Sequence, residues 1–422
     1  MALTQTGAND RIRLGFIGVA NRGSQLLSAF LTRENPNNWA DIEIAALCDV
    51  HGTVLQAAKE RVEREKPGSK PDTYEDFRKM LERQDIDAIV IATPDHWHAI
   101  QTIEACRAGK DVYVEKPVSI TVREGRRMVE VARETKRIVT VGLHRRSALL
   151  YAQAAEFVRD GGLGHVSVSR TFHRSNLYPA GIGRETPSDP PPDLNWDMWL
   201  GPRPLRPFQA NIAPYKFRWW TLYSSQTANN GVHFFDCVRW ITGDEAPTSI
   251  CAMGGKYAVD DDRTIPDTLH VTYQFPAGRL LNFGMYESSG NRTLPREGYF
   301  EIRGTRGTMY CGDRRFEVIP ERGGQFQDSK PRMEPMDVKE EGNNQNHTAL
   351  HARNFLDCMR SREMPNCDIE VGHRSTLMAH LAKISHTLGK RIEWDPVAEQ
   401  VTNCPEANDL LHYEYRAPWK LS

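Results

Sequence analysis

Few features of this sequence point to a membrane, a nucleic acid or a disulfide framework. No stretch approaches roughly 18 consecutive apolar residues, so we expect no segment to span a membrane. Long basic runs are absent and the formal net charge is −1, which argues against nucleic acid as a partner because phosphate binding needs clustered Lys and Arg. The eight cysteines include no Cys-x-x-Cys pair, so we expect free thiols in a chain of this size.

The beginning of the sequence also lacks the apolar core of a signal peptide. Residues 1–10 are polar, so the chain as written predicts a cytoplasmic protein. What the sequence does have is length and apolar content. Its 422 residues, of which 39% are hydrophobic, are enough for two domains with packed cores.

A glycine-rich turn follows the first apolar strand. Residues 11–19 have strand character, and apolar residues then recur at helical spacing from Leu26 to Leu31. Between them lies a G-x-A-x-x-G turn, in which glycine allows close approach to a pyrophosphate and the helix N-terminus presents N–H groups to the anion. Ala20 replaces the usual second glycine. The residues that we expect to contact a dinucleotide here are Gly18, Ala20, Asn21, Arg22 and Gly23.

The second strand, residues 42–48, ends at an acidic residue, Asp49. A carboxylate at this place can accept hydrogen bonds from the adenosine ribose diol, and it would repel a 2′-phosphate. We therefore expect NAD rather than NADP. The alternative is that Asp49 is an ordinary loop carboxylate.

Three further apolar segments, residues 88–92, 112–114 and 138–142, alternate with helical patterns. This alternation predicts a parallel, doubly wound sheet, whose ligands lie at the carboxyl ends of the strands. Polar residues follow each segment. The cofactor-binding candidates among them are Thr93, Pro94, His96, Trp97, His98, Glu115, Lys116 and His144. We expect this Rossmann domain to occupy residues 1–145 and a second domain to occupy 146–422.

In combination these motifs make the chain similar to the Gfo/Idh/MocA oxidoreductases, named for glucose–fructose oxidoreductase and inositol dehydrogenase. The matching segments are Gly18–Gly23, Thr93-Pro94 with His98, Glu115–Pro117, Gly231–Asp236, Gly304–Thr308 and Arg391–Asp395. The resemblance implies a Rossmann domain, a second α+β domain and bound NAD(H). It also implies that Lys116 is catalytic and that an Asp stands four residues before His233. In this chain that position is Asn229.

The chain is more similar still to one branch of this family, which is abundant in environmental bacteria. It shares with that branch the segments Asp95–His98, Asn195–Pro202 and Tyr415–Trp419. Many members of the branch carry a twin-arginine export signal ahead of a start like Gly7–Arg11. A periplasmic location after export is therefore the alternative to a cytoplasmic one.

The second half of the sequence predicts an α+β domain. Residues 166–173 and several segments between 248 and 310 have strand character, with hairpin turns between them. They predict an open, mainly antiparallel sheet with one face free for a partner subunit, so we expect a homo-oligomer, a dimer or a tetramer. Residues 174–220, rich in Pro, Trp and Arg, predict an ordered loop that lines a pocket. The alternative is that its tryptophans only anchor the loop.

Lys116 and His233 are the residues that we expect to carry the chemistry. A free lysine has a pKa of about 10.4, and burial beside a cationic nicotinamide ring would lower it. An amide takes no proton, so Asn229 can only orient a hydroxyl, and general-base work falls to Lys116 or His233. The alternative for His233 is a core histidine with satisfied hydrogen bonds.

The candidates for contacts with a sugar come from both halves of the chain. The aromatic loop offers tyrosine hydroxyls as proton donors and tryptophan faces that suit a carbohydrate, whereas Arg146 could equally pair with a structural carboxylate. The expected substrate-binding set is Lys116, His144, Arg146, Tyr178, Trp219, Tyr223, Asn229 and His233. His347 and His351 are four residues apart but no further ligand completes a zinc motif, so we expect no metal.

Together these residues predict NAD(H)-dependent oxidation or reduction of a sugar at a ring carbon, with Lys116 or His233 exchanging the hydroxyl proton. One alternative is a glycosidase that oxidises a sugar hydroxyl transiently, loses the glycosidic bond by elimination, adds water and takes the hydride back, so that NAD is retained. Another is a non-catalytic NADH-binding module.

Overall fold

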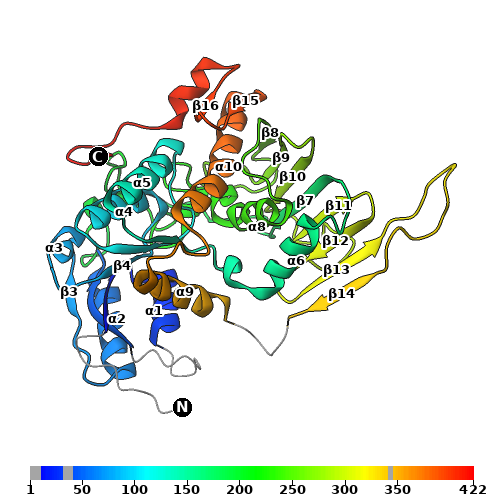
Figure 1. Cartoon of the computed structure of the whole chain (residues 1–422). Coiled ribbons are helices and arrows are strands. Elements are labelled where there is room, and N and C mark those ends of the chain that lie inside the picture. The colour runs from blue at the N-terminus through cyan, green and yellow to red at the C-terminus, as the bar shows by residue number, and fades with distance from the viewer. Residues whose placement is uncertain (1–10, 32–40, 341–345) are drawn as a thin grey trace, which may run out of the picture.

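The computed structural model describes residues 11–31, 41–340 and 346–422 (Figure 1). Within these residues the chain forms two large sheets with helices packed between and around them. Residues Gly7–Asp10, which bear on the expectation of export, lie outside the described part.

The first sheet is parallel, and its described strands have the order β3-β2-β1-β4-β5-β6. They are β1 (Ile12–Ile17), β2 (Ile42–Cys48), β3 (Asp72–Tyr74), β4 (Ala88–Ile91), β5 (Asp111–Val114) and β6 (Val139–Val141). The connecting helices are α1 (Asn21–Leu31), α2 (Gly52–Glu65), α3 (Phe77–Leu81), α4 (His98–Arg107) and α5 (Val122–Thr135). The strand order turns back between β1 and β4, and such a switch point is where doubly wound sheets bind ligands. The α/β fold predicted for this domain is confirmed.

The second sheet has the order β14-β13-β12-β11-β7-β10-β9-β8-β15-β16 within the described residues. Its strands are β7 (Val166–Arg174), β8 (Ser249–Gly255), β9 (Thr268–Gln274), β10 (Leu280–Tyr286), β11 (Phe300–Gly304), β12 (Gly307–Cys311), β13 (Arg315–Pro320), β14 (Met336–Lys339), β15 (Ile392–Asp395) and β16 (Gln400–Val401). Among these strands only β7 and β10 pair in parallel. The predicted open, mainly antiparallel sheet is confirmed.

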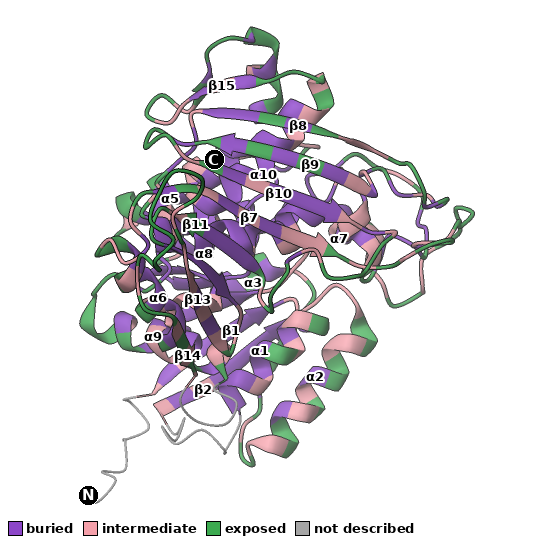
Figure 2. Cartoon of the chain, turned by 90° about the vertical axis from the view of Figure 1, so that its right-hand side faces the viewer, coloured by how far each residue is buried: buried purple, intermediate pink, exposed green. Residues whose placement is uncertain are grey.

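Helices cover one face of this second sheet. They are α6 (Leu149–Arg159), α8 (Val232–Thr242) and α10 (Ile369–Leu388), and in Figure 1 they lie between the two sheets. Their apolar side chains form one core with the inward residues of the strands. The opposite face is open toward the viewer in Figure 2, and alternate residues along β9 are exposed there. This alternation is the pattern of a sheet with one packed face and one free face.

Segments late in the chain return to the first sheet. Helix α9 (His347–Ser361) inserts Ala352, Phe355 and Leu356 into the apolar cluster around β1 and α1. At the end of the chain, Trp419 packs edge-on against Trp97 at a centroid distance of 4.7 Å and stacks on Phe77. The shorter helices and helical turns before α9 include η3 (Asp95–Trp97), η4 (His144–Ser147), α7 (Trp196–Leu200) and η5 (Lys216–Trp219). A π-helical turn (Thr227–Gly231) leads into α8, and η7 (Pro405–Leu411) precedes the tail.

The turn between β1 and α1 depends on two glycines. Gly18 has φ +80°, in the left-handed region, and a Cβ there would lie 2.8 Å from backbone atoms of Ala92 and Thr93. A Cβ at Gly23 would lie 2.0 Å from the carbonyl oxygen of Gly18. The backbone of the turn is therefore folded back on itself so closely that only hydrogen fits at these two positions.

We expect Gly23→Ala to distort this turn and to lower the free energy of unfolding by about 1–3 kcal/mol, the usual cost of overpacking. Affinity for a dinucleotide should fall with it. Thermal unfolding and NADH fluorescence titration measure the two effects. Gly52→Ala is the matched control, because a Cβ at Gly52 meets nothing nearer than 3.6 Å. Equal stability and affinity of the two variants would contradict the expectation.

Candidate active site

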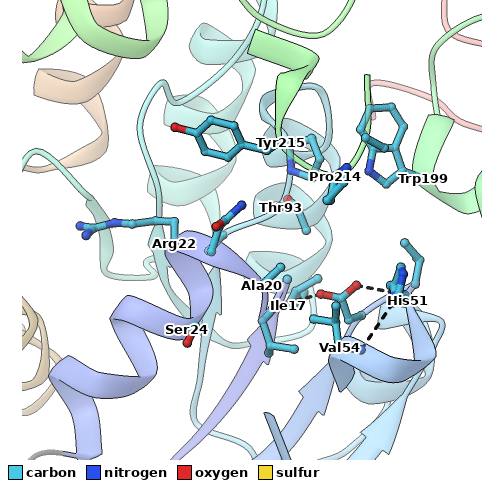
Figure 3. A pocket seen from close by; sticks show the side chains of 18 of the residues that line it. Ile17, Ala20, Arg22, Ser24, His51, Val54, Thr93, Trp199, Pro214 and Tyr215 are labelled. Atoms are coloured by element: carbon cyan, nitrogen blue, oxygen red, sulfur yellow. Dashed lines mark hydrogen bonds between the residues drawn. The ribbon is translucent and has the colours of Figure 1, made fainter. Parts of the chain in front are cut away.

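A cavity of about 960 Å³ runs along the carboxyl ends of β1, β2, β4 and β5. Its other wall is a segment that we call the cap, residues 191–218, which belongs to the aromatic loop. Figure 3 shows Ala20 and Thr93 on the side of the first sheet, facing Trp199, Pro214 and Tyr215 of the cap. The loop between β7 and α8 therefore lines a pocket, as the sequence predicted.

Asp49 follows the last residue of β2, and its carboxylate is hydrogen-bonded to the glycine turn. Its carboxylate accepts hydrogen bonds from the backbone N–H of Val19 at 2.9 Å and of His51 at 3.1 Å. Burial raises its pKa, and these N–H groups oppose the increase. His51 caps α2 through its ring and also lines the cavity, close to Val54 in Figure 3.

This end of the cavity fits a dinucleotide. The turn brings the N-terminus of α1 to the cavity with no side chain beyond Cβ at residues 18 and 20, and the first N–H groups of a helix have no partner within the helix. Asp49 adds a carboxylate where a ribose diol would lie. The residues that would hold the cofactor are those of the Gly18–Gly23 turn together with Asp49, Thr93 and Pro94, all on or beside the cavity wall.

Lys116 leaves the end of β5 and reaches across to the second half of the chain. Its Nζ donates hydrogen bonds to the backbone oxygen of Asn229 at 2.9 Å and to Oδ1 of the same residue at 3.0 Å. Burial lowers the pKa of Lys116 to about 8, while the neighbouring carboxylates of Glu115 and Asp95 oppose the decrease. The amine is therefore mostly protonated at neutral pH but keeps a neutral fraction that grows as pH approaches 8, so it can both take and give a proton.

Glu115, the residue before this lysine, is held in an ion pair. Nε of Arg22 donates to its Oε1 at 2.7 Å, which joins the first turn of α1 to the end of β5. A Cβ at Gly142 would lie 2.7 Å from the same oxygen. The backbone directly after β6 therefore approaches the Glu115 carboxylate closely. Both Glu115 and Arg22 line the cavity.

His233 and His144 face each other beside Lys116. Their ring centroids are 5.5 Å apart, and Nδ1 of each is buried without a hydrogen-bond partner among the described residues. Burial lowers the pKa of both rings well below the ordinary value, the charge of Lys116 adds to the effect at His233, and the charge of Arg145 adds to it at both rings. Both imidazoles are thus neutral at neutral pH, and the Nδ1 atom of each is shielded from solvent.

Two other histidines of the strand ends bind backbone instead of facing the cavity. Nε2 of His96 lies 2.9 Å from the carbonyl oxygen of Trp199. The ring nitrogens of His98 lie 2.7 Å from Pro117 O and 2.9 Å from Thr93 O. His98 therefore joins the ends of β4 and β5, and His96 fastens the cap to the first domain. Trp97 donates to the same Trp199 oxygen at 3.1 Å and also lines the cavity.

Of the eight expected sugar-binding residues, Lys116 and Asn229 line the cavity, His233 lies beside Lys116 and faces His144, and the other four lie elsewhere. The guanidinium of Arg146 is paired with the buried carboxylate of Asp236 at 2.9 Å, as the structural alternative had it. Trp219 donates its ring N–H to Glu287 at 2.9 Å. Tyr223 is fully buried against Trp199, whereas Tyr178 is 64% exposed. The structure thus brings Lys116, Asn229, His233 and His144 together and separates them from these four.

Asp95 and Arg218 are cavity residues that sequence reasoning missed. Asp95 follows Pro94 directly, so its place at a strand end was the available signal. Its carboxylate accepts a hydrogen bond from Ser224 and is only 6% exposed. Arg218 lies in the irregular aromatic loop, and no local pattern of the sequence separates it from the other arginines there.

Metal ligands and membrane helices were also sought in the described ranges. These ranges contain no group of three His, Cys, Asp or Glu side chains arranged to hold a metal ion. His347 instead pairs with Glu340 at 2.6 Å, and His351 lies 2.8 Å from the backbone oxygen of Val141. No helix in the same ranges has the length and apolar character needed to cross a membrane.

Comparison with curated proteins gives relatives that match part of the chain. A curated glycosyl hydrolase family 109 protein of Shewanella baltica is 36% identical over 131 residues, which are 30% of this chain and 27% of that protein. An alpha-N-acetylgalactosaminidase of Shewanella oneidensis is 35% identical over 130 residues, again 30% of this chain and 27% of that protein. The chain thus matches about a quarter of the length of these relatives.

Solved structures resemble the chain over most of its length. Levoglucosan dehydrogenase in complex with NADH and levoglucosan has a TM-score of 0.67 at 16% identity, covering 91% of this chain and 99% of that chain. The aldose-aldose oxidoreductase of Caulobacter crescentus has a TM-score of 0.65 at 18% identity with the same coverage. At such low identity these structures establish the fold.

Family models settle the relationship. The model of the oxidoreductase family's NAD-binding Rossmann fold matches residues 12–143. The model of the same family's C-terminal alpha/beta domain matches residues 224–393. Together the two models cover well over half of the chain, and they are the two halves of one architecture. The chain therefore belongs to the Gfo/Idh/MocA oxidoreductase family.

Proposed function

We propose that the protein is an NAD(H)-dependent oxidoreductase that acts on a ring hydroxyl or ketone of a sugar or glycoside. The observation that carries the proposal is Lys116, a partly buried amine with its pKa lowered to about 8, held by Asn229 at the reactive end of the cofactor cavity. A purely binding module has no need of such a proton carrier. The names of the structurally similar levoglucosan and aldose enzymes support a carbohydrate substrate.

In this mechanism NAD(H), when bound, accepts or supplies the hydride. Lys116 takes the hydroxyl proton as the substrate carbon loses its hydride, and the ammonium returns a proton when a ketone is reduced. Asn229 keeps the amine oriented through its Oδ1 and backbone oxygen. His233 stays neutral beside Lys116, so it adds no positive charge next to the amine. The cap closes the cavity from the side of the second domain and limits access of water.

The alternative function is an NAD-dependent glycosidase that works by transient oxidation, elimination, hydration and re-reduction. The names of the Shewanella relatives favour it. The way in which the cap is fastened favours it too. Gly52 N–H donates to the backbone oxygen of Asp193 at 2.8 Å, and Asn195 N–H donates to the oxygen of Val50 at 2.9 Å. A cap fastened by main-chain bonds suits a reaction that regenerates its cofactor in every cycle and needs no exchange of it.

Asp49 and the neighbouring turn support NAD rather than NADP in either function. The homo-oligomer, the location in the cell, the domain boundary after residue 145 and the substrate contacts of Arg146, Tyr178, Trp219 and Tyr223 remain predictions.

The proposal is tested by following NADH formation and aglycone release from a panel of pyranosides and aryl glycosides, with and without added NAD. We expect Lys116→Met to lower turnover by about 10²–10⁴-fold, the usual contribution of a general base, while NADH binding is retained. Lys79→Met, at an exposed position on α3, is the control. NADH formation in proportion to substrate supports the dehydrogenase, and aglycone release without net NADH supports the glycosidase. Full activity of Lys116→Met would rule out this mechanism.

The pH dependence should follow the protonation of Lys116. Oxidation needs the neutral amine, so its kcat/KM should rise with pH through a midpoint near the lysine pKa of about 8. Reduction needs the ammonium form, so its kcat/KM should fall through the same midpoint. Initial rates in both directions between pH 6 and about 10 check the expectation. Profiles that change in the same sense in both directions would contradict it.

Asp49→Asn should relax the choice between NAD and NADP. The amide oxygen can still accept the N–H of Val19, but the negative charge that repels a 2′-phosphate is lost. We expect the ratio of NADPH to NADH dissociation constants to fall by roughly tenfold, about 1.4 kcal/mol. Fluorescence titration of the two cofactors measures the ratio. Glu82→Gln, an exposed acid outside the cavity, should leave it unchanged.

A further inference from the structure

The hydrogen-bond partners of Lys116 at position 229 are both uncharged. Nζ donates to an amide oxygen and to a backbone carbonyl, so no carboxylate of α8 or of the turn before it balances the ammonium form. The second half of the chain thus supplies orientation to the amine but no negative charge. Any such charge has to come from the first domain.

The charged groups that act on Lys116 come from four elements. In the described residues they are Glu115 from the end of β5, Arg22 from α1, Arg218 from η5 in the cap, and Asp95 from η3. His233 of α8 also lies close but is neutral. The charge of Glu115 is matched by Arg22 in an ion pair at 2.7 Å. Asp95 is therefore the carboxylate left to oppose Arg218 beside the lysine.

The fold brings Asp95 to this place through neighbouring strands. β4 and β5 pair in parallel with Ile91 opposite Val114, so the residues that follow each strand emerge at the same sheet edge. Asp95 comes four residues after Ile91 and Lys116 comes two after Val114, and both line the cavity. Because the sheet fixes this edge, the two side chains are held near each other before any ligand binds.

One short segment, residues 224–229, holds both residues that flank the Lys116 side chain. Ser224 donates its hydroxyl hydrogen to Oδ2 of Asp95. The next residue, Ser225, accepts the N–H of Asn229 at 2.7 Å through its backbone oxygen. The segment 224–229 thus fixes Asp95 on one side of Lys116 and Asn229 on the other.

We propose that Asp95 is a positioning residue for Lys116 and supplies the negative charge that an acid at position 229 would otherwise provide. This rests on the proposed function, in which Lys116 exchanges the hydroxyl proton. During oxidation the proton passes from the substrate oxygen to the amine, and the Asp95 carboxylate stabilises the ammonium that forms. During reduction the ammonium gives the proton back to the substrate oxygen.

The surroundings of Asp95 are consistent with this role. Burial raises its pKa, but the positive charges of His98, Arg218 and Lys116 and the hydrogen bond from Ser224 all oppose the increase. Burial likewise lowers the pKa of Lys116, and Asp95 opposes that decrease. Each group thus favours the charged form of the other inside a cavity where solvent screening is weak.

The test measures the titration of Lys116 itself, in the purified protein without substrate. Labelling of Lys116 by acetic anhydride at a series of pH values, read by mass spectrometry, gives the midpoint at which the amine becomes reactive. We expect Asp95→Asn to lower this midpoint by about one pH unit, since an opposite charge at close range shifts a pKa by roughly 1–3 units. Asn229→Asp should raise the midpoint, and it serves as the matched control of opposite sign.

Ser224→Ala gives a second reading that keeps the carboxyl group in place, for use if Asp95→Asn does not fold. Loss of the hydrogen bond weakens the ionised form of Asp95, so the Lys116 midpoint should again fall. The proposal is overturned if Asp95→Asn leaves the Lys116 midpoint unchanged while Asn229→Asp raises it. If Asp95→Asn does not fold, the same comparison is made with Ser224→Ala.

Kinetics then separate this proposal from the proposed function. In Asp95→Asn the pH profile of oxidation should move to lower pH by the same amount as the labelling midpoint. If labelling shifts as expected but Lys116→Met keeps full turnover, the proposed function fails and the coupling of the two residues stands. If Lys116→Met is inactive and Asp95→Asn leaves both the midpoint and the profile unchanged, the proposed function stands and the coupling of Asp95 to Lys116 fails.

Discussion

The contact between Lys116 and Asn229 is the interaction on which the rest of the site depends. It spans 113 residues of sequence and joins the end of β5 in the first sheet to the π-helical turn that begins α8. A hydrogen bond made by a charged group contributes roughly 1.5–3 kcal/mol, and this amine makes two of them. The end of β5 and the turn before α8 are therefore held together, with the proton carrier between them.

Charged groups near Lys116 are arranged in ion pairs, which leave the pKa of its amine to be set largely by burial. Arg22 is bound to Glu115 and Arg146 to Asp236, so neither arginine is free to repel the lysine strongly or to attract substrate anions. The buried imidazoles of His144 and His233 remain neutral and add no further positive charge. Burial can then bring the pKa of Lys116 down to about 8 without driving the amine to full deprotonation.

Sequence reasoning succeeded where structure is local and was limited where it depends on distant contacts. The turn from Gly18 to Gly23 was predictable because part of its steric constraint is local: a Cβ at Gly23 would meet the carbonyl oxygen of Gly18. The strand ends predicted that Lys116 would lie at the ligand-binding edge of the parallel sheet, and it does line the cavity there. The ion pair between Arg22 and Glu115 was not predictable, because it requires knowing how closely α1 approaches β5. His98 stands at the same edge but is turned toward two backbone oxygens by the loops around it.

The packing of the aromatic loop was likewise not predictable from local sequence patterns. This packing bears on the chemistry. Its apolar side chains, among them Trp199, Phe217 and Tyr223, form a separate small core that no helical or strand period could have revealed. That core stiffens the cap, and the tail of the chain adds a bond from Arg416 to the oxygen of Gly201 at 2.9 Å. The cap is therefore fastened at both ends, to the loop after β2 through Gly52 and Asn195 and to the tail through Arg416. In the proposed glycosidase reaction the hydride leaves and returns within one cycle, so a fastened cap does not slow turnover, because that reaction needs no exchange of cofactor.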